Sequence, residues 1–168
     1  HATAEGFRTH PLWQRWDAAD ERFDVLLRPL GAHGSWSGVD PIAGHDPGDV
    51  PDPDAPGAGG PVAVLTRATV RWRRLPEFLR SVPEVDAHLG SVDGVLQAVG
   101  IGEVPVGRQA TFSLWRDAEA VQRFAYRSAE HAGVIRRTRE RDWYGEEWFA
   151  RFAPIAWSGT WDGERPLG

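Results

Sequence analysis

The chain has 168 residues, a net charge of −5 and 41% hydrophobic residues, among them nine tryptophans and seven phenylalanines. This is enough for one domain with an apolar core, and the negative charge gives no electrostatic case for nucleic-acid binding. The lack of cysteine excludes disulfides, thiolate metal sites and a cysteine nucleophile, and with neither an apolar membrane span nor a signal peptide visible we expect a cytoplasmic protein without a transmembrane segment.

Two segments near the ends of the chain resemble each other at an offset of 125 residues. They read FDVLLRPLGAHGSW at 23–36 and WFARFAPIAWSGTW at 148–161, and each is followed by a polar residue and a glycine. The matches include Pro29 with Pro154, Gly34 with Gly159 and Trp36 with Trp161. The repeat predicts that residues 1–38 are the C-terminal helix and strand of a first unit, whose missing part is an upstream segment or is replaced by a second copy in a homodimer.

Residues 39–60 have the composition of a linker. They contain five prolines, five glycines and five aspartates, and almost no large apolar side chain. The aspartate spacing fits no calcium loop of the EF-hand type, so the segment indicates a solvated connection.

Residues 61–168 are expected to form a complete α+β unit. Alternating β-branched residues predict strands at 62–72, 95–104 and 108–115, with a last strand from about 147 to 155. Pro76 suits the first turn of a short helix, and Asp117 suits the N-cap of another, whose apolar face holds Ala118, Val121 and Phe124. The order βαββαβ is that of a ferredoxin-like domain. Its second sheet face needs a cover, which a second such sheet supplies in an α/β-barrel arrangement.

Alternation along the strands separates two faces of the predicted sheet. We expect Ala110, Phe112 and Leu114 to pack under the helices. The other face would be polar, and its members are Arg67, Gln97, Gln109, Thr111 and Ser113. Such a face indicates either a ligand cavity or a sheet surface open to water.

His131 is the histidine that the helical pattern places among apolar neighbours. Val134, Ile135 and Thr138 follow at spacings of three, four and seven residues, which puts all four on one stripe. A lone histidine in such a place is either a core residue or a ligand. The arginines that follow, Arg136 and Arg137 among them, indicate a solvated face or an anion site, and Tyr126 is a second candidate ligand nearby.

Several long motifs resemble the spheroidene monooxygenase family of haem-containing carotenoid oxygenases. They are LTRATVRWRRLPEFLRSVP at 65–83, VGIGEVPVGRQATFSLW at 99–115, the FAYR segment with His131, RRTRERDWYGEEWFARF at 136–152, and the GSWSG and GTWDG turns around Trp36 and Trp161. The similarity covers nearly all of the chain outside the linker. It implies two tandem ferredoxin-like units folded as a dimeric α/β-barrel.

The resemblance also implies an enzyme with bound haem b that inserts oxygen into an apolar small molecule with electrons from an external donor. His131 would then be the axial iron ligand, with Tyr126, Arg136 and Arg137 in the cofactor site. Arg67, Gln97 and Gln109 become the candidate catalytic residues, which would polarise oxygen or hold a propionate. Three alternatives remain open: another haem reaction such as aldoxime dehydration or N–N chemistry, a non-catalytic haem carrier or sensor, and a cofactor-free oxygenase.

Overall fold

A computed structural model describes residues 11, 18–46, 48, 59–80, 91–103, 107–127 and 143–168. Its labelled elements are β1 Phe23–Gly34, β2 Val62–Val70, the 3₁₀ turn η1 Trp72–Arg74, β3 Val95–Glu103, β4 Arg108–Trp115, α4 Ala118–Arg127 and β5 Tyr144–Gly159. Residues 75–80 continue η1 as a helical segment. None of the helices in these ranges offers a membrane-spanning apolar stretch.

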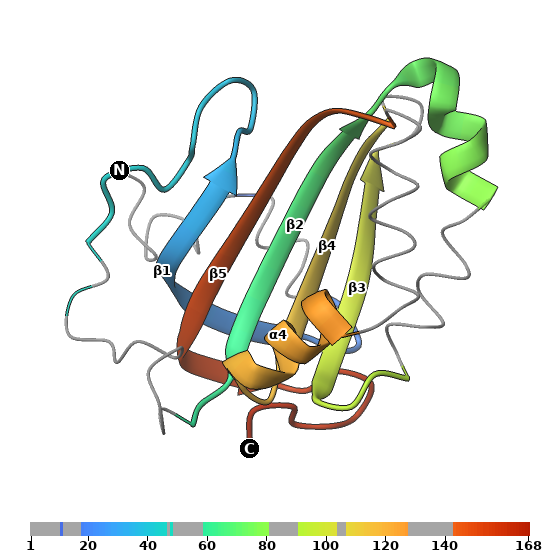
Figure 1. Ribbon diagram of the computed structural model, residues 1–168. Coiled ribbons are helices and arrows are strands. Elements are labelled where there is room, and N and C mark those ends of the chain that lie inside the picture. The colour runs from blue at the N-terminus through green and yellow to red at the C-terminus, as the bar shows by residue number, and fades with distance from the viewer. Residues whose placement is uncertain are drawn as a thin grey trace.

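The five strands form one antiparallel sheet in the order β1-β5-β2-β4-β3 (Figure 1). The last four strands of that order give the arrangement of a ferredoxin-like unit, so the ferredoxin-like part of the predicted fold class is confirmed. The strand at 108–115 has the predicted bounds, whereas β5 is longer than predicted and runs over Tyr144–Gly159. Of its extra residues, Tyr144 and Glu146 pair with β2, and those at 156–159 pair with β1, which lies at the edge of the sheet as a fifth strand.

One face of the sheet is covered by α4. Val62 and Val64 of β2 and Trp115 of β4 pack there against Ala118 and Val121, which confirms the predicted apolar face of this helix. Burial of such side chains is the main favourable contribution to the stability of this layer.

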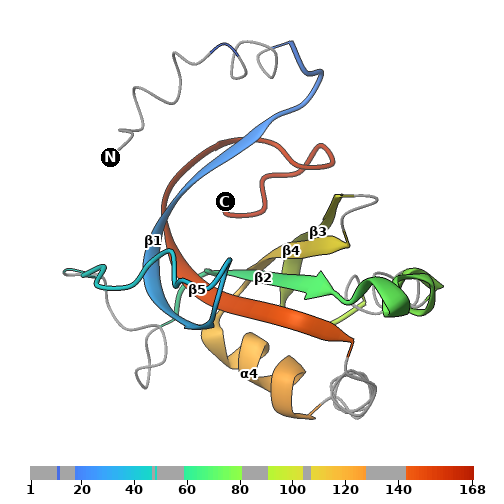
Figure 2. The ribbon, with the colours of Figure 1, turned by 90° about the horizontal axis from the view of Figure 1, so that it is seen from above.

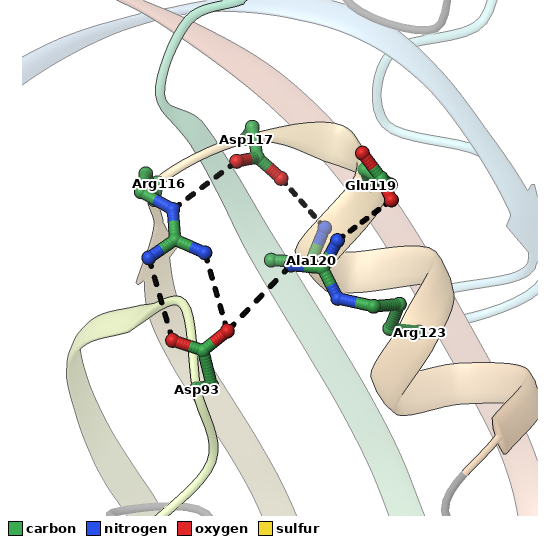
Figure 3. A network of polar contacts seen from close by, with 6 residues as sticks. All are labelled: Asp93, Arg116, Asp117, Glu119, Ala120 and Arg123. Atoms are coloured by element: carbon green, nitrogen blue, oxygen red, sulfur yellow. Dashed lines mark hydrogen bonds and ion pairs between the residues drawn. The ribbon is translucent and has the colours of Figure 1, made fainter.

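Polar contacts fix the start of α4. The carboxylate of Asp117 accepts the N–H of Ala120 at 2.7 Å, as expected for an N-cap. Arg116 binds Asp93 and Asp117, and Arg123 joins Asp93 to Glu119 (Figure 3). The turn before β3 is thereby tied to the first turn of the helix.

The helix-free face carries a second apolar cluster. Ala63, Leu114, Trp148, Ala150 and Phe152 are buried there. Leu65 lies opposite Phe112, and Arg67 lies opposite Ala110. Because side chains opposite one another on paired strands point to the same side of a sheet, the prediction that Ala110, Phe112 and Leu114 pack under the helices is wrong. As β4 is apolar on both faces near its end, alternation alone could not say which face the helices cover.

The first residues of the proposed linker are attached to the sheet. Val39 forms a β-bridge with Trp36. Asp40 accepts the indole N–H of Trp148 at 3.0 Å, and Ile42 packs on the helix-free cluster. Residues 47 and 49–58 of this segment lie outside the described residues.

Candidate functional site

A cavity of about 350 Å³ lies on the helix-free face of the sheet. In Figure 2, β1 and the far part of β5 curve around this face, and the C-terminal segment returns inside the curve, on the side opposite α4. The residues that line the cavity are Glu21, Arg22, Phe23, Val25, Val99, Ile101, Phe112, Thr160 and Trp161. Most of its wall is apolar, and its polar groups gather around Glu21, which suits an apolar ligand held by a few polar contacts.

Trp161 makes ring contacts with two other residues of the cavity wall. Its ring stacks on Phe112 with centroids 6.3 Å apart and planes at 10°, and Phe23 contacts it at 6.0 Å. The side-chain amide of Gln97 donates to the carbonyl oxygen of Trp161 at 3.3 Å. Gln97 thus holds the residue that closes one end of the cavity.

Val99 and Ile101 of β3 provide the open part of the wall. They are 41% and 53% exposed although both side chains are aliphatic. Exposed apolar residues that lie side by side on a concave surface often mark a binding site. An apolar ligand in this cavity would remove both side chains from water.

Glu21 places a negative charge beside the apolar wall. Its carboxylate accepts the N–H groups of Asp162 and Gly163 at 3.0 and 2.7 Å and the hydroxyl of Thr160 at 2.8 Å. The hydrogen bond from Gly163, followed by that from Thr160, lowers the pKa of Glu21 below its usual value. Glu21 therefore remains ionised at neutral pH.

A second carboxylate, Glu146, closes the turn after β1. It accepts the N–H groups of Gly38 and Ser37 at 2.8 and 3.0 Å, and these bonds, with that from Arg67, lower its pKa to about 2. Arg67 is 4% exposed, binds Glu146 at 2.6 Å and lies 5.1 Å from the ring centre of Trp36. The guanidinium of Arg67 is thus engaged in a contact that holds the fold together.

The structure brings together only part of the predicted polar group. Gln97 and Arg67 lie on the helix-free face, as the register of β3, β4 and β2 requires. Gln109 is on the opposite face, where its side chain lies over Gly102. The prediction that Gln109 shares a face with Arg67 and Gln97 is therefore wrong, and the same register moves Thr111 and Ser113 to the side of α4. Ser113 accepts the indole N–H of Trp115 there at 2.8 Å.

The predicted cofactor ligands fall elsewhere. His131, Arg136 and Arg137 lie outside the described residues, and Tyr126 is described only through the backbone of α4. Sequence reasoning missed Glu21 and Glu146. Their signal is the offset of 125 itself, since extending the repeat two residues upstream of Phe23 and Trp148 aligns one glutamate with the other.

The sheet order defines a ferredoxin-like domain, and an apolar cavity lies on its helix-free face. Among solved structures, the FN1347 protein of Fusobacterium nucleatum matches 93% of this chain with 65% of its own, at a TM-score of 0.56 and 11% identity. PA3566 of Pseudomonas aeruginosa matches 58% of this chain with 96% of its own, at a TM-score of 0.52 and 14% identity. At such low identity these likenesses concern the fold.

Sequence relatives are more specific. A spheroidene monooxygenase of Rhodobacter capsulatus is 37% identical over 159 residues, which are 94% of this chain and 64% of that protein. The same-named protein of Cereibacter sphaeroides is 36% identical over 161 residues, 94% of this chain and 47% of that protein. Three curated spheroidene monooxygenases, 36–37% identical over most of this chain, support its assignment to the spheroidene monooxygenase family. It spans about half to two thirds of the length of these relatives, and no protein-family model matches it.

Proposed function

We propose that this chain forms the substrate-binding part of a monooxygenase that acts on an apolar, carotenoid-like molecule. The observation that carries the proposal is the cavity on the helix-free face, where Val99, Ile101, Phe112 and Trp161 offer an apolar wall. A long hydrocarbon would gain free energy by leaving water for such a wall. The names of the curated relatives support the choice of reaction and substrate class.

Residues of the chain would orient this substrate rather than react with it. Phe112 and Trp161 present stacked rings, against which a flat conjugated molecule can lie. Exclusion of water from this surface would strengthen any polar contact made by the ionised Glu21 at the rim. We propose that a second sheet placed over the helix-free face completes the enclosure as an α/β-barrel, in a homodimer or a longer chain.

The proposed cofactor is haem b, whose iron His131 would hold, with Tyr126, Arg136 and Arg137 as further candidate cofactor-binding residues. When bound, the haem would supply the activation of oxygen, and an external donor would supply the electrons. Among the described residues, α4 with Tyr126 lies on the face of the sheet opposite Val99 and Ile101, so the cavity residues do not support this placement of the haem. The choice of His131 as the ligand rests on the family resemblance of the sequence segment that contains it.

Two experiments separate the substrate proposal from the cofactor proposal. Quenching of tryptophan fluorescence by a carotenoid measures binding to the purified protein. We expect Ile101→Glu to weaken it at least tenfold because a carboxylate would enter the apolar wall. Ile155→Glu is the matched control, since Ile155 is 41% exposed but does not line the cavity. Equal binding by both variants would refute the proposed substrate site.

A visible spectrum after supplementation with haem tests the cofactor. We expect a Soret band in the unaltered protein and its loss or displacement in His131→Ala. A band unchanged in the variant would remove His131 as the ligand. A colourless protein that still oxygenates the substrate would instead favour cofactor-free chemistry.

A further inference from the structure

β1 and β5 are related to each other by an approximate two-fold axis. In their antiparallel pairing Phe23 lies opposite Gly159 and Gly34 lies opposite Trp148. Under the offset of 125 residues Phe23 corresponds to Trp148 and Gly159 corresponds to Gly34, so the two pairs are equivalent. The turns that follow have the same shape, since Gly34 and Gly159 have φ of 87° and 90°.

The contacts around the two turns repeat as well. Ser35 donates its N–H to Glu147 at 2.9 Å, and Thr160 donates its own to Arg22 at 3.0 Å. Trp36 packs edge-on against Trp148, with ring centres 5.7 Å apart, and the equivalent rings of Trp161 and Phe23 are 6.0 Å apart. Glu146 closes the first turn as Glu21 closes the second.

The surroundings of the two glutamates differ in one respect. Beside β5 lies β2, whose Arg67 is opposite Trp148 and binds Glu146. The equivalent place beside β1 is the edge of the described sheet. The pairing of β2 with β5 can be shifted by the offset of 125 residues onto β1. A strand equivalent to β2 would then lie beside β1, opposite residues 21–27, and its residue equivalent to Arg67 would lie opposite Phe23.

The cavity lies where the side chain of that arginine would point. Glu21, Phe23, Val25 and Trp161 line the cavity. Trp161 is the counterpart of Trp36, the ring over which the guanidinium of Arg67 lies. Glu21 and Trp161 are therefore placed to bind a guanidinium in the way that Glu146 and Trp36 bind Arg67.

We propose that the outer edge of β1, over residues 21–27, is a docking site for an extended polypeptide strand that carries an arginine, whose guanidinium binds Glu21 and lies over Trp161. The strand would add to the sheet through its main chain, as in β-strand addition, and the charged pair would set its register. The inference does not depend on the proposed oxygenase activity. It identifies the wall that closes the cavity on the side of β1.

A peptide with the sequence of residues 61–70, PVAVLTRATV, is the probe, because β2 makes the same contacts to β5. Fluorescence anisotropy of the labelled peptide measures binding to the unaltered 168-residue chain, and hydrogen exchange locates it. We expect saturable binding with slower exchange at residues 21–27. Replacing the arginine of the peptide by glutamine should weaken binding about tenfold or more, and so should Glu21→Gln in the protein.

Asp20→Asn is the matched control, since it removes a charge from the exposed neighbouring residue and should leave binding unchanged. The altered peptide tests the pair without any change to the folding of the protein. When both changes are combined, the loss should not exceed that of either alone, as expected for two groups that act on each other. Equal binding of both peptides would overturn the proposal, and so would protection confined to another strand. A dimer of the chain that occupies this edge and that the peptide cannot displace would also overturn it.

Discussion

Arg67 and Glu146 form an ion pair of 2.6 Å in which the arginine side chain is 5% exposed and the glutamate side chain 22%. The same carboxylate accepts the hydroxyl of Ser35 at 2.9 Å and two backbone N–H groups of the following turn. One glutamate thus joins β2, β5 and the turn after β1. If this carboxylate were removed, the buried guanidinium of Arg67 would be left without a counter-charge. An uncompensated buried charge is the main reason why breaking such a pair destabilises a protein.

Glu146→Gln should destabilise the protein in a way that depends on pH. The pKa of Glu146 falls from 4.5 to about 2 on folding, so its charged form favours the folded state. This stabilisation is present above pH 4.5 and is lost as the pH falls toward 2. Thermal unfolding should show a lower Tm for the variant at pH 7 and a shrinking difference from the unaltered protein below pH 4.5. A difference that is constant from pH 7 to pH 3 would contradict the assigned charge.

Gly159→Ala should destabilise the protein by about 2–3 kcal/mol. Gly159 has φ of 90°, and a Cβ there would meet the carbonyl oxygen of Arg22. Gly31→Ala is the control, since a Cβ at Gly31 meets nothing within 4 Å. Urea unfolding measures both free energies, and equal values would show that the turn tolerates a side chain.

Asp117→Ala should cost about 1 kcal/mol of stability, because the N–H of Ala120 loses its acceptor at the start of α4. Asp117→Asn should retain most of this stability, since an asparagine oxygen caps helices about as well. Chemical denaturation of the three proteins compares these values. Equal losses in the two variants would assign the effect to the ion pair with Arg116.

Leu114→Ala and Ile101→Ala should affect different properties. Leu114 is fully buried between neighbouring strands, so its truncation should cost about 2–5 kcal/mol. Ile101 is 53% exposed in the cavity wall, and its truncation should change stability by less than about 1 kcal/mol while weakening the binding of an apolar ligand. Unfolding and carotenoid titration of both variants would test this separation.

The sequence pattern predicts the strands, the order of a ferredoxin-like unit and the cap of α4, because these follow from local periodicity and turn residues. Its failures concern tertiary relationships. Alternation put Phe112 and Leu114 under the helices, although the register with β2 turns them to the other face. Composition placed Asp40 and Ile42 in a linker, yet Asp40 accepts the indole N–H of Trp148, 108 residues further along the chain, and Ile42 packs on the helix-free cluster.

Of the candidate site, too, only part could be predicted from the sequence. The repeat pointed to Trp161 and its turn, but the role of Glu21 depends on hydrogen bonds to Asp162 and Gly163, 141 and 142 residues further along the chain. Arg67 was placed correctly on the helix-free face. The repeat aligns Glu146 with Glu21, but the ion pair between Glu146 and Arg67 could not be predicted, since spacing along the chain says nothing of contacts across strands.

The central position of β5 has a consequence for how the chain acquires its structure. This strand lies between β1 and β2, and it is the last strand of the sequence. During synthesis β1 therefore emerges more than 100 residues before the only described strand to which it is hydrogen-bonded. The assembly of this sheet is dominated by distant pairings, which slow folding, and the edge of β1 that pairs with β5 stays exposed until β5 has been synthesised.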